Sequence, residues 1–520
     1  MSKSYLKSFL LRAAQIARRS LHQGIPIDEY LHQVQSAQVS RRTLLRTGLA
    51  VGGAVAGVGL NQVLRPDRAS ATSRSSILIL GAGIAGLTAA YRLRQAGVVA
   101  EIVEARSAVG GRMKTLQNAL GTSTGAELGG EFIDTGHDRI RSLAGELGVK
   151  LQDLTQTDTG LTLDTFYFQG RKIDLAEVTQ AFIPLIPKLE RDAALLDDLT
   201  TPTAIALDQL SITAYLAKQP ISGLLRSLLE VAYTLEFGRE ASEQSCFNLI
   251  DLIGKNPNRF EAYGDSDEHF HIIGGNGQIP QKLAKRLSNA ITIETELEQL
   301  KLRSDGRYRA SFRSGGRSFE RTYERVLLTV PFSVLRRIEL DLPLPQGKRR
   351  AIDRLGYGTN SKVIGTYSEA VWKRYGAAGS VFTDLPSQGG WEATRYATSR
   401  TRLYTNFTGG IQGRSVGAET PEFQAQRVAT HYNRIFPGME AAYQGKAVRA
   451  YWTGQSYSRG SYSCYLVGQW TSISGEEQPR VGNLFFAGEH CSAIAQGYME
   501  GGCETGEAAA REILADLGVN

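Results

Sequence analysis

Apolar residues beyond position 75 alternate between short continuous runs and longer helical repeats. Residues 76–80 (Ser-Ile-Leu-Ile-Leu) form a continuous apolar run, which is typical of a buried strand in a parallel sheet. The next apolar residues recur at helical spacing, at Ile84, Leu87, Ala90 and Leu93. Gly97 predicts the end of that helix, and residues 98–103 predict a second strand. This order of elements predicts an α/β fold.

Two long central segments differ in their pattern. Residues 133–269 are rich in helical periodicity, as at Leu189, Ala193, Leu196 and Leu199, which follow a helix-starting Pro187. Residues 346–477 contain alternating and aromatic stretches that predict strands. A helical pattern returns at residues 499–514. No internal repeat connects these segments.

The first 71 residues carry a separate signal. Arg41-Arg42 precede an apolar run of thirteen residues, Gly48 to Leu60, which is shorter than the roughly 20 residues that a membrane-spanning helix needs. Residues 69–71 (Ala-Ser-Ala) have the small-x-small form of a cleavage site. The segment resembles a twin-arginine export leader, which implies the twin-arginine translocation machinery as a partner and a location in the periplasm or an equivalent lumen. The alternative is an N-terminal helix followed by a linker.

About forty residues precede the arginine pair, more than an export signal needs. Apolar residues recur among them at helical spacing, at Leu6, Phe9, Leu10, Ala13, Ile16 and Ala17. Two roles remain open for this helix: peripheral contact with a membrane surface, or contact with a partner.

Charge and cysteine content narrow the function classes. The net charge of +7 resides in residues 1–71, which hold ten Lys/Arg and three Asp/Glu, and the remaining residues hold 49 of each sign. A neutral body argues against nucleic-acid binding, which needs a basic face on the folded domain. The four cysteines, Cys246, Cys464, Cys491 and Cys503, form no CxxC pair and no metal-ligand spacing. We expect four free, mostly buried thiols and no metal site.

A glycine-rich turn joins the first strand to its helix. Gly81, Gly83 and Gly86 have the GxGxxG spacing, which permits a tight turn, lets a pyrophosphate approach the backbone and lets the helix pack on the strand. The helix N-terminus offers free N–H donors to the phosphates. Glu104 ends the second strand, where a carboxylate accepts from a ribose hydroxyl and repels the 2′-phosphate of NADP.

Further motifs separate FAD from NAD. Residues 104–106 (Glu-Ala-Arg), 110–112 (Gly-Gly-Arg) and 127–130 (Glu-Leu-Gly-Gly), together with the C-terminal segments 482–489 and 496–502, resemble the two FAD half-signatures of the flavin-containing amine oxidase family. The resemblance implies that Arg106 lies near the adenosine ribose and that Arg112 neutralises the pyrophosphate. It also implies that Glu489 binds the ribityl chain and that the Met499 N–H meets the flavin.

The resemblance extends over nearly the whole chain after the leader. Segments 271–280, 326–331 and 457–462 match further family motifs, and residues 291–297 are expected to form a strand that brings Leu297 to the adenine. Ser461 stands where some monoamine oxidases carry a flavin-linking cysteine, so we expect non-covalent FAD. The cofactor-binding residues are expected to be Gly81, Gly83, Ile84, Ala85, Gly86, Glu104, Ala105, Arg106, Gly111, Arg112, Gly129, Gly130, Glu131, Leu297, Glu489, Tyr498 and Met499.

The expected fold is a Rossmann-like FAD-binding domain of the glutathione-reductase type with a discontinuous α+β substrate domain. After the leader (1–71), the FAD-binding domain takes residues 72–132, 270–345 and 478–520. The substrate domain takes residues 133–269, which are mainly helical, and residues 346–477.

Flavin amine oxidation requires placement of the substrate carbon and a neutral amine more than acid–base groups. Tyr462 and Tyr498 match the family's aromatic cage, and we expect them to act in catalysis together with Trp452 and Arg337. Arg336 and Arg337 stand where many relatives have a water-holding lysine. Phe132 stands where many L-amino acid oxidases bind the substrate carboxylate with an arginine.

Two segments nevertheless favour an L-amino acid as the substrate. Residues 383–386 and 267–271 resemble segments of L-amino acid oxidases, in which basic amino acids such as arginine or lysine are common substrates. The candidate acids for a cationic side chain are Glu131, Asp265 and Glu392. The electron acceptor, oxygen or a quinone, is left open, as is a homodimer.

Three alternatives remain. Phe132 and the tyrosine pair favour a primary-amine or polyamine oxidase. A flavin desaturase or isomerase acting on an apolar substrate would lack the tyrosine cage. A flavin-binding protein without enzyme activity has no feature in its favour.

Overall fold

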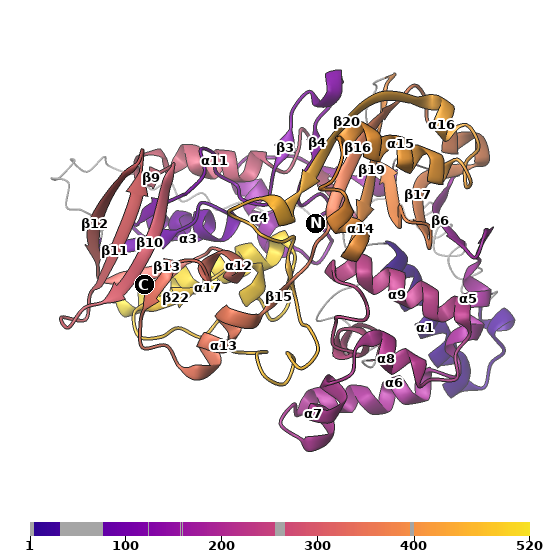
Figure 1. Ribbon diagram of the computed structural model, residues 1–520, viewed down its shortest axis with the longest axis horizontal. Helices are drawn as coiled ribbons and strands as arrows, with labels where there is room; N and C mark the ends of the chain where they lie inside the picture. Colours follow the sequence, from indigo (N-terminus) through magenta and orange to yellow (C-terminus); the bar gives the residue numbers. More distant parts are fainter. Residues whose placement is uncertain are drawn as a thin grey trace, which may run out of the picture.

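A five-stranded parallel sheet forms the centre of the FAD-binding half, at the left of Figure 1. The computed structural model describes residues 5–31, 76–122, 124–156, 158, 160–254, 266–395 and 400–519. The strands lie in the order β22 (Leu484–Phe486), β13 (Arg325–Leu328), β1 (Ile77–Leu80), β2 (Glu101–Val103) and β9 (Ile291–Thr292). Every pair is parallel, and the α/β fold class is confirmed.

The two faces of β1 explain the continuous apolar run. Because successive side chains of a strand point to opposite faces, Ile77 and Ile79 pack into one core and Leu78 and Leu80 into another. The first core includes α3 (Ile84–Gln95) and α17 (Met499–Asp516). The second includes a four-stranded sheet of β12 (Arg317–Tyr323), β11 (Tyr308–Ser314), β10 (Thr295–Leu302) and β14 (Glu339–Asp341).

A seven-stranded mixed sheet forms the substrate half. Its order is β20 (Tyr443–Tyr451), β16 (Ser361–Tyr367), β19 (Arg402–Thr408), β18 (Gly389–Glu392), β17 (Ala377–Thr383), β6 (Thr162–Phe168) and β7 (Arg171–Lys172). Only β17 and β6 pair in parallel. The sheet therefore joins segments of the chain from both substrate-domain insertions.

Helices cover this sheet. One set packs with it in a single apolar core: α5 (Leu175–Phe182), α6 (Ile186–Ala193), α7 (Pro202–Asp208), α8 (Ile212–Ala217) and α9 (Gly223–Phe237). Four of them begin after a side chain that accepts from a backbone N–H three residues on, namely Asp174, Thr201, Ser211 and Ser222. In a separate core, α15 (Pro421–Tyr432) packs against the sheet.

The remaining helices and paired strands are shorter. The helices among them are α4 (Asp138–Glu146), α10 (Phe247–Leu249), α11 (Gln278–Arg286), α12 (Phe332–Leu335), α13 (Gln346–Arg354), α14 (Gly410–Ser415) and α16 (Met439–Ala442). The paired strands are β3 (Thr115–Leu116) with β4 (Ala126–Glu127), β5 (Leu151–Asp153) with β8 (Phe270–Ile272), and β15 (Gly356–Tyr357) with β21 (Ser463–Cys464).

Some predicted boundaries differ from the structure. The second strand covers residues 101–103 rather than 98–103. The single strand expected at 291–297 is two strands, β9 and β10, because Glu294 takes a left-handed conformation (φ 51°) that turns the chain out of the parallel sheet. Gly97 follows the end of α3, and the C-terminal helix covers residues 499–516, as predicted. The four cysteines are free and buried, which confirms the prediction for the thiols.

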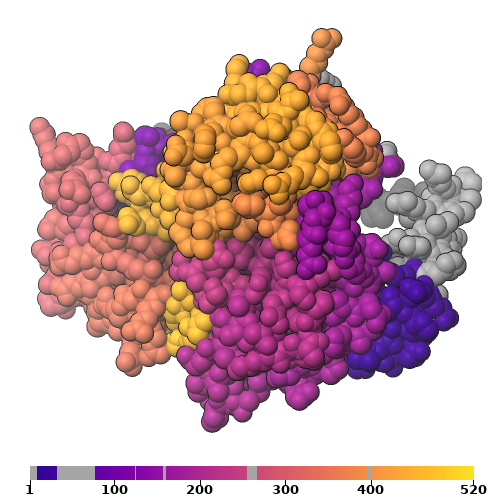
Figure 2. All heavy atoms as spheres, turned by 45° about the vertical axis from the view of Figure 1, so that its right-hand side comes forward, coloured from indigo at the N-terminus to yellow at the C-terminus, as the bar shows by residue number. Residues whose placement is uncertain are grey.

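The N-terminal helix α1 (Tyr5–Gln23) lies against the helices of the substrate half, shown in indigo in Figure 2. The arginine pair, the apolar run and the small-x-small site of the predicted leader lie outside the described residues. Within the described ranges, no helix is both long and apolar enough to cross a membrane.

Candidate active site

The turn after β1 has the geometry of a dinucleotide site. Gly81 has φ 105°, a conformation that glycine adopts without strain. A side chain on Gly86 would overlap the Gly81 carbonyl oxygen, whereas an added Cβ on Gly83 would meet no protein atom within 4 Å. The open space beside Gly83 lies at the first turn of α3, where N–H groups are free for phosphate oxygens.

A cavity of about 540 Å³ extends from this turn. Fifteen of the predicted site residues line it: Gly81, Gly83, Ile84, Ala85, Glu104, Ala105, Arg106, Gly111, Arg112, Gly130, Leu297, Arg337, Glu489, Tyr498 and Met499. They come from positions far apart in the chain, and the parallel sheet brings them together.

Glu104 and Arg106 shape one end of the cavity. The Glu104 carboxylate accepts from the Ala82 N–H (2.8 Å) and the Arg106 N–H (2.9 Å), which holds the acid at the carboxyl end of β2. Arg106 donates to the Ser458 hydroxyl (2.5 Å) and the Gly111 carbonyl (3.2 Å). Burial lowers the pKa of Arg106.

Glu489 and Arg112 form the buried ion pair of the cavity. Arg112 Nη1 lies 2.8 Å from Glu489 Oε1 and 2.7 Å from the Ser461 carbonyl oxygen. The carboxylate also accepts from the Ser463 hydroxyl (2.8 Å) and the Gly497 N–H (2.9 Å). Burial opposes ionisation, but the Arg112 charge holds the pKa of Glu489 below its ordinary value.

These residues fit an FAD molecule. The open space at Gly83, the helix N-terminus, the ribose-side carboxylate of Glu104 and the Arg112 cation are the donor set that a dinucleotide requires. Met499 begins α17, so its end of the cavity also faces a helix N-terminus. Gly129 does not line the cavity, but a side chain there would overlap the Arg112 carbonyl oxygen, so this glycine lets two backbone segments meet.

The predicted tyrosines are both buried. Tyr498 lines the cavity, and its ring packs edge-on against His137 with centroids 4.9 Å apart. Tyr462 is fully buried and donates to the Leu235 carbonyl (3.1 Å). Trp452 packs in a small cluster with Tyr462 and donates to the Leu128 carbonyl (3.0 Å). Burial raises the pKa of each tyrosine, so both hydroxyls stay protonated.

Glu131 takes a different place from the one predicted. Its carboxylate pairs with Lys362 Nζ (2.7 Å) and accepts from Trp391 Nε1 (2.9 Å), and it does not line the cavity. Burial opposes ionisation, but Lys362 holds the pKa of Glu131 below its ordinary value. The acid is therefore engaged by the protein's own cation rather than open to a substrate.

Lys362, on β16, was missed in the sequence. It is 2% exposed and also donates to the Gly129 carbonyl (2.9 Å), directly beside the FAD cavity. Arg336 and Arg337, which stand in the sequence where many relatives have a water-holding lysine, lie elsewhere: Arg336 donates to two backbone carbonyls near α13, and Arg337 lines the FAD cavity. A lysine within the apolar strand pattern of residues 361–367 was the available signal.

Phe132 is buried, with its ring centroid 5.5 Å from that of Trp391. The Arg395 guanidinium lies 5.9 Å from the Phe132 ring and 3.8 Å from Asp158. Of the acids proposed for a cationic side chain, Glu392 accepts from Trp372 Nε1 (3.1 Å) and lies 3.4 Å from Arg402. Asp265 lies outside the described residues.

A second residue missed in the sequence is an acid next to the residue that binds Tyr462. Glu236, near the end of α9, is 1% exposed, and it follows the Leu235 carbonyl that binds Tyr462. After burial, the charge of Glu236 is the next largest influence that raises the pKa of both Tyr462 and Tyr498. Because the neighbouring Leu235 carbonyl binds Tyr462, Glu236 lies near that hydroxyl, but it does not line the cavity. No motif marks it, because an acid at the end of a helix is an ordinary feature of sequences.

The fold and cavity define a dinucleotide-dependent oxidoreductase with a separate substrate half. The family model described as flavin containing amine oxidoreductase matches residues 84–514, and the chain belongs to this family. It is therefore an amine oxidoreductase that uses FAD. The comparisons confirm both the cofactor and the enzyme class.

Curated relatives include the flavin-containing amine oxidase B of Cavia porcellus, 24% identical over 468 residues that cover 86% of this chain and 87% of the relative. The Homo sapiens protein of the same name is 23% identical with the same coverage. These relatives are amine oxidases, so the predicted closer resemblance to L-amino acid oxidases is not borne out by them.

Solved structures show the same fold. Cyclohexylamine oxidase from Brevibacterium oxydans IH-35A has a TM-score of 0.74 and 22% identity, covering 85% of this chain and 99% of that one. A putrescine oxidase bound to putrescine has a TM-score of 0.72 and 21% identity, covering 84% and 98%.

Proposed function

We propose that the protein oxidises the α-carbon of a primary amine that carries a second positive charge, such as a short diamine. The observation that carries the proposal is the buried Glu236 carboxylate, which is next in sequence to the Leu235 carbonyl that Tyr462 binds. A carboxylate in this place attracts a distal ammonium group and would reject an apolar substrate. The putrescine oxidase of the same fold supports a diamine.

The chemistry is a two-electron oxidation. FAD bound in the cavity would supply the acceptor for a hydride from the α-carbon; with loss of a proton from the amine nitrogen the C–N single bond becomes an imine, which water hydrolyses to an aldehyde and ammonia. Tyr462 and Tyr498 would flank the amine, and their protonated hydroxyls keep further negative charge away from it. Lys362 donates to the Glu131 carboxylate and to the Glu127 and Gly129 carbonyls, so its three N–H groups are engaged by the protein.

A basic L-amino acid is the second candidate. Phe132 offers no charge to a substrate carboxylate, and buried charges are costly unless they are paired. The Arg395 guanidinium lies 5.9 Å from the Phe132 ring and its side chain is 6% exposed, so it is an arginine close to the position where L-amino acid oxidases bind the carboxylate. The comparisons support the amine more than the amino acid.

Two substrate pairs distinguish these candidates. Cadaverine and L-lysine differ only by the carboxylate, as do agmatine and L-arginine. We expect peroxide or dye reduction with the decarboxylated member of each pair and at least tenfold lower kcat/KM with the amino acid. The reverse order would identify an L-amino acid oxidase and make the diamine proposal wrong.

The role of Glu236 can be tested with pentylamine, a substrate that lacks the second positive charge of cadaverine. Glu236→Gln should raise KM for cadaverine by about ten- to a hundredfold, as expected for loss of a hydrogen bond between charged groups, and should leave pentylamine nearly unchanged. Glu230→Gln, on the same helix α9, is the matched control. Equal losses for both amines in Glu236→Gln would mean that the acid only supports the fold.

We also propose that FAD is held by contacts alone. Ser461 lacks the sulfur needed for a thioether, and its hydroxyl donates to Asn360 Oδ1 (2.7 Å). Acid precipitation should release the yellow colour into the supernatant. Flavin that stays with the pellet would overturn this assignment.

Export by the twin-arginine route remains a proposal. It rests on Arg41-Arg42 and the apolar run that follows. Replacing both arginines by lysine should leave holoenzyme in the cytoplasm of the producing cell. Unchanged export of the double variant would exclude this route.

A further inference from the structure

The N-terminal helix α1 occupies a groove in the substrate half. It contacts α5, α6, α9 and the short π-helix η4 (Ile250–Gly254). Figure 2 shows residues 5–31 seated on the flank of the helical segment. This helix lies within the segment that the sequence assigns to an export leader, although a leader has no reason to join the folded core.

The buried face of α1 is extensive. Six apolar side chains are each at most 5% exposed: Leu10, Leu11, Ala13, Ala14, Ile16 and Ala17. Five of them belong to the same core as the helices of the substrate half. In addition, the Phe9 ring stacks on Phe166 of the mixed sheet, with centroids 3.8 Å apart. The apolar face therefore packs against this chain's own core rather than facing a membrane surface.

Arg18 makes the packing specific. It is 4% exposed, and its Nε donates to Glu190 Oε1 on α6 (2.6 Å). Its Nη2 donates to the Ile253 carbonyl of η4 (3.1 Å). Burial lowers the pKa of Arg18, and the Glu190 charge opposes that shift. A buried arginine with two defined acceptors fixes the register of α1 in the groove.

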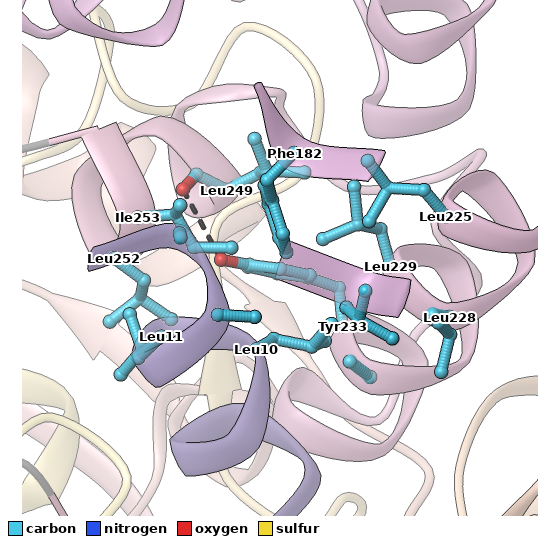
Figure 3. Close-up of a cluster of buried hydrophobic side chains, with 14 of the residues drawn as sticks. Leu10, Leu11, Phe182, Leu225, Leu228, Leu229, Tyr233, Leu249, Leu252 and Ile253 are labelled. Atoms are coloured by element: carbon cyan, nitrogen blue, oxygen red, sulfur yellow. Dashed lines mark hydrogen bonds between the residues drawn. The ribbon is translucent and has the colours of Figure 1, made fainter. Parts of the chain in front are cut away.

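The groove also borders α9, the helix that carries Glu236. In Figure 3, Leu10 and Leu11 of α1 lie beside Tyr233, Leu252 and Ile253. The Tyr233 hydroxyl donates to the Leu249 carbonyl (3.2 Å), just before η4. Tyr233 and Glu236 lie three residues apart on α9, one turn of the helix. Loss of α1 would expose this side of α9 to water.

We propose that residues 5–31 are a permanent part of the enzyme, and that α1 stays in its groove even when the chain is cut between it and residue 76. Processing after Ala71 would then give a two-piece enzyme rather than a shortened one. The inference rests on the packing of α1 and is independent of the substrate.

A cut in the purified holoenzyme tests this proposal. A recognition sequence for a site-specific protease is inserted between Asp67 and Arg68, and the cut protein is passed over a size-exclusion column. We expect the short fragment to co-elute with the body in a one-to-one ratio and the Tm to stay within about 2 °C of the uncut value, since a two-piece fold keeps the same contacts. A fragment that elutes separately would overturn the proposal, whether the body remains folded or aggregates.

Matched variants on α1 identify the contacts. Arg18→Gln should speed release of the cut fragment by about tenfold, as expected for the loss of hydrogen bonds from a charged group. Arg12→Gln, on the exposed side of the same helix, should not. Leu10→Asp should release the fragment, whereas Leu21→Asp, at a side chain that is 43% exposed, should leave it bound. If the two variants of each pair released the fragment equally, the assignment of the buried face of α1 would be wrong.

Discussion

The two halves of the molecule recognise their ligands in different ways. In the FAD-binding half, Gly83 and the first turn of α3 present backbone to the cofactor, and only small residues fit such close approaches. In the substrate half, the proposed recognition depends on side chains such as Glu236, which comes from α9. Backbone recognition constrains a short run of sequence, whereas side-chain recognition can be built from any elements that the fold brings together.

The largest effect is expected at the ion pair on the boundary between the halves. Lys362→Met leaves the buried Glu131 carboxylate without its cation, which typically costs about 3–5 kcal/mol of unfolding free energy. Urea denaturation of the holoenzyme measures this. The double variant Lys362→Met/Glu131→Gln should recover most of the loss, and a double variant as unstable as the single one would show that the pair is not coupled.

A pH-dependent loss is expected in the FAD-binding half. His490 is buried, and burial lowers its pKa to about 4, from 6.5. The unfolded chain therefore takes up a proton between pH 6.5 and 4 that the folded protein refuses, so stability falls as the pH falls through this window. His490→Gln should lose less stability between pH 7 and pH 4.5, by about 2.5 kcal/mol. Parallel curves for the two proteins would contradict the shift.

Gly83→Ala tests backbone recognition in the FAD-binding half directly. The added methyl meets no protein atom within 4 Å, so the apoprotein should keep its Tm, but the methyl occupies space beside the pyrophosphate. We expect FAD affinity to fall about a hundredfold, equivalent to about 2.7 kcal/mol. Gly145→Ala, at another open position, is the control. Tight FAD binding by Gly83→Ala would place the cofactor elsewhere.

The sequence predicted the FAD-binding half better than the substrate half, because backbone recognition leaves a short sequence motif and side-chain recognition does not. The GxGxxG turn, Glu104, Arg112 and Glu489 all lie in motifs, and the structure brings them to one cavity. Glu236 and Lys362 lie in no motif. Glu236 is on α9, and Lys362 is on β16 of a mixed sheet whose strand order, with β6 between β7 and β17, cannot be derived from local patterns.

The N-terminal helix shows the same limit. Its helical spacing predicted the helix itself, and α1 covers residues 5–23. Its docking surface, however, is made of α5, α6, α9 and η4. These elements lie more than a hundred residues after α1 in the sequence. Periodicity reports that a face is apolar but not what covers it.

The smallest effect is expected from removing the Tyr462 hydroxyl. Comparing Tyr462→Phe with Tyr462→Ala separates the role of the ring from that of the hydroxyl. This hydroxyl donates to the Leu235 carbonyl and is fully buried, so it is already engaged by the protein. Tyr462→Phe should therefore cost about 1 kcal/mol of unfolding free energy, the typical net value of one hydrogen bond, and change kcat/KM for cadaverine by less than about threefold. Tyr462→Ala, which removes the ring, should lower kcat/KM by about two decades if the ring positions the amine. Steady-state kinetics with cadaverine and pentylamine measure both. A large loss in Tyr462→Phe that is confined to L-lysine would instead assign the hydroxyl to a substrate carboxylate and favour the amino acid over the amine.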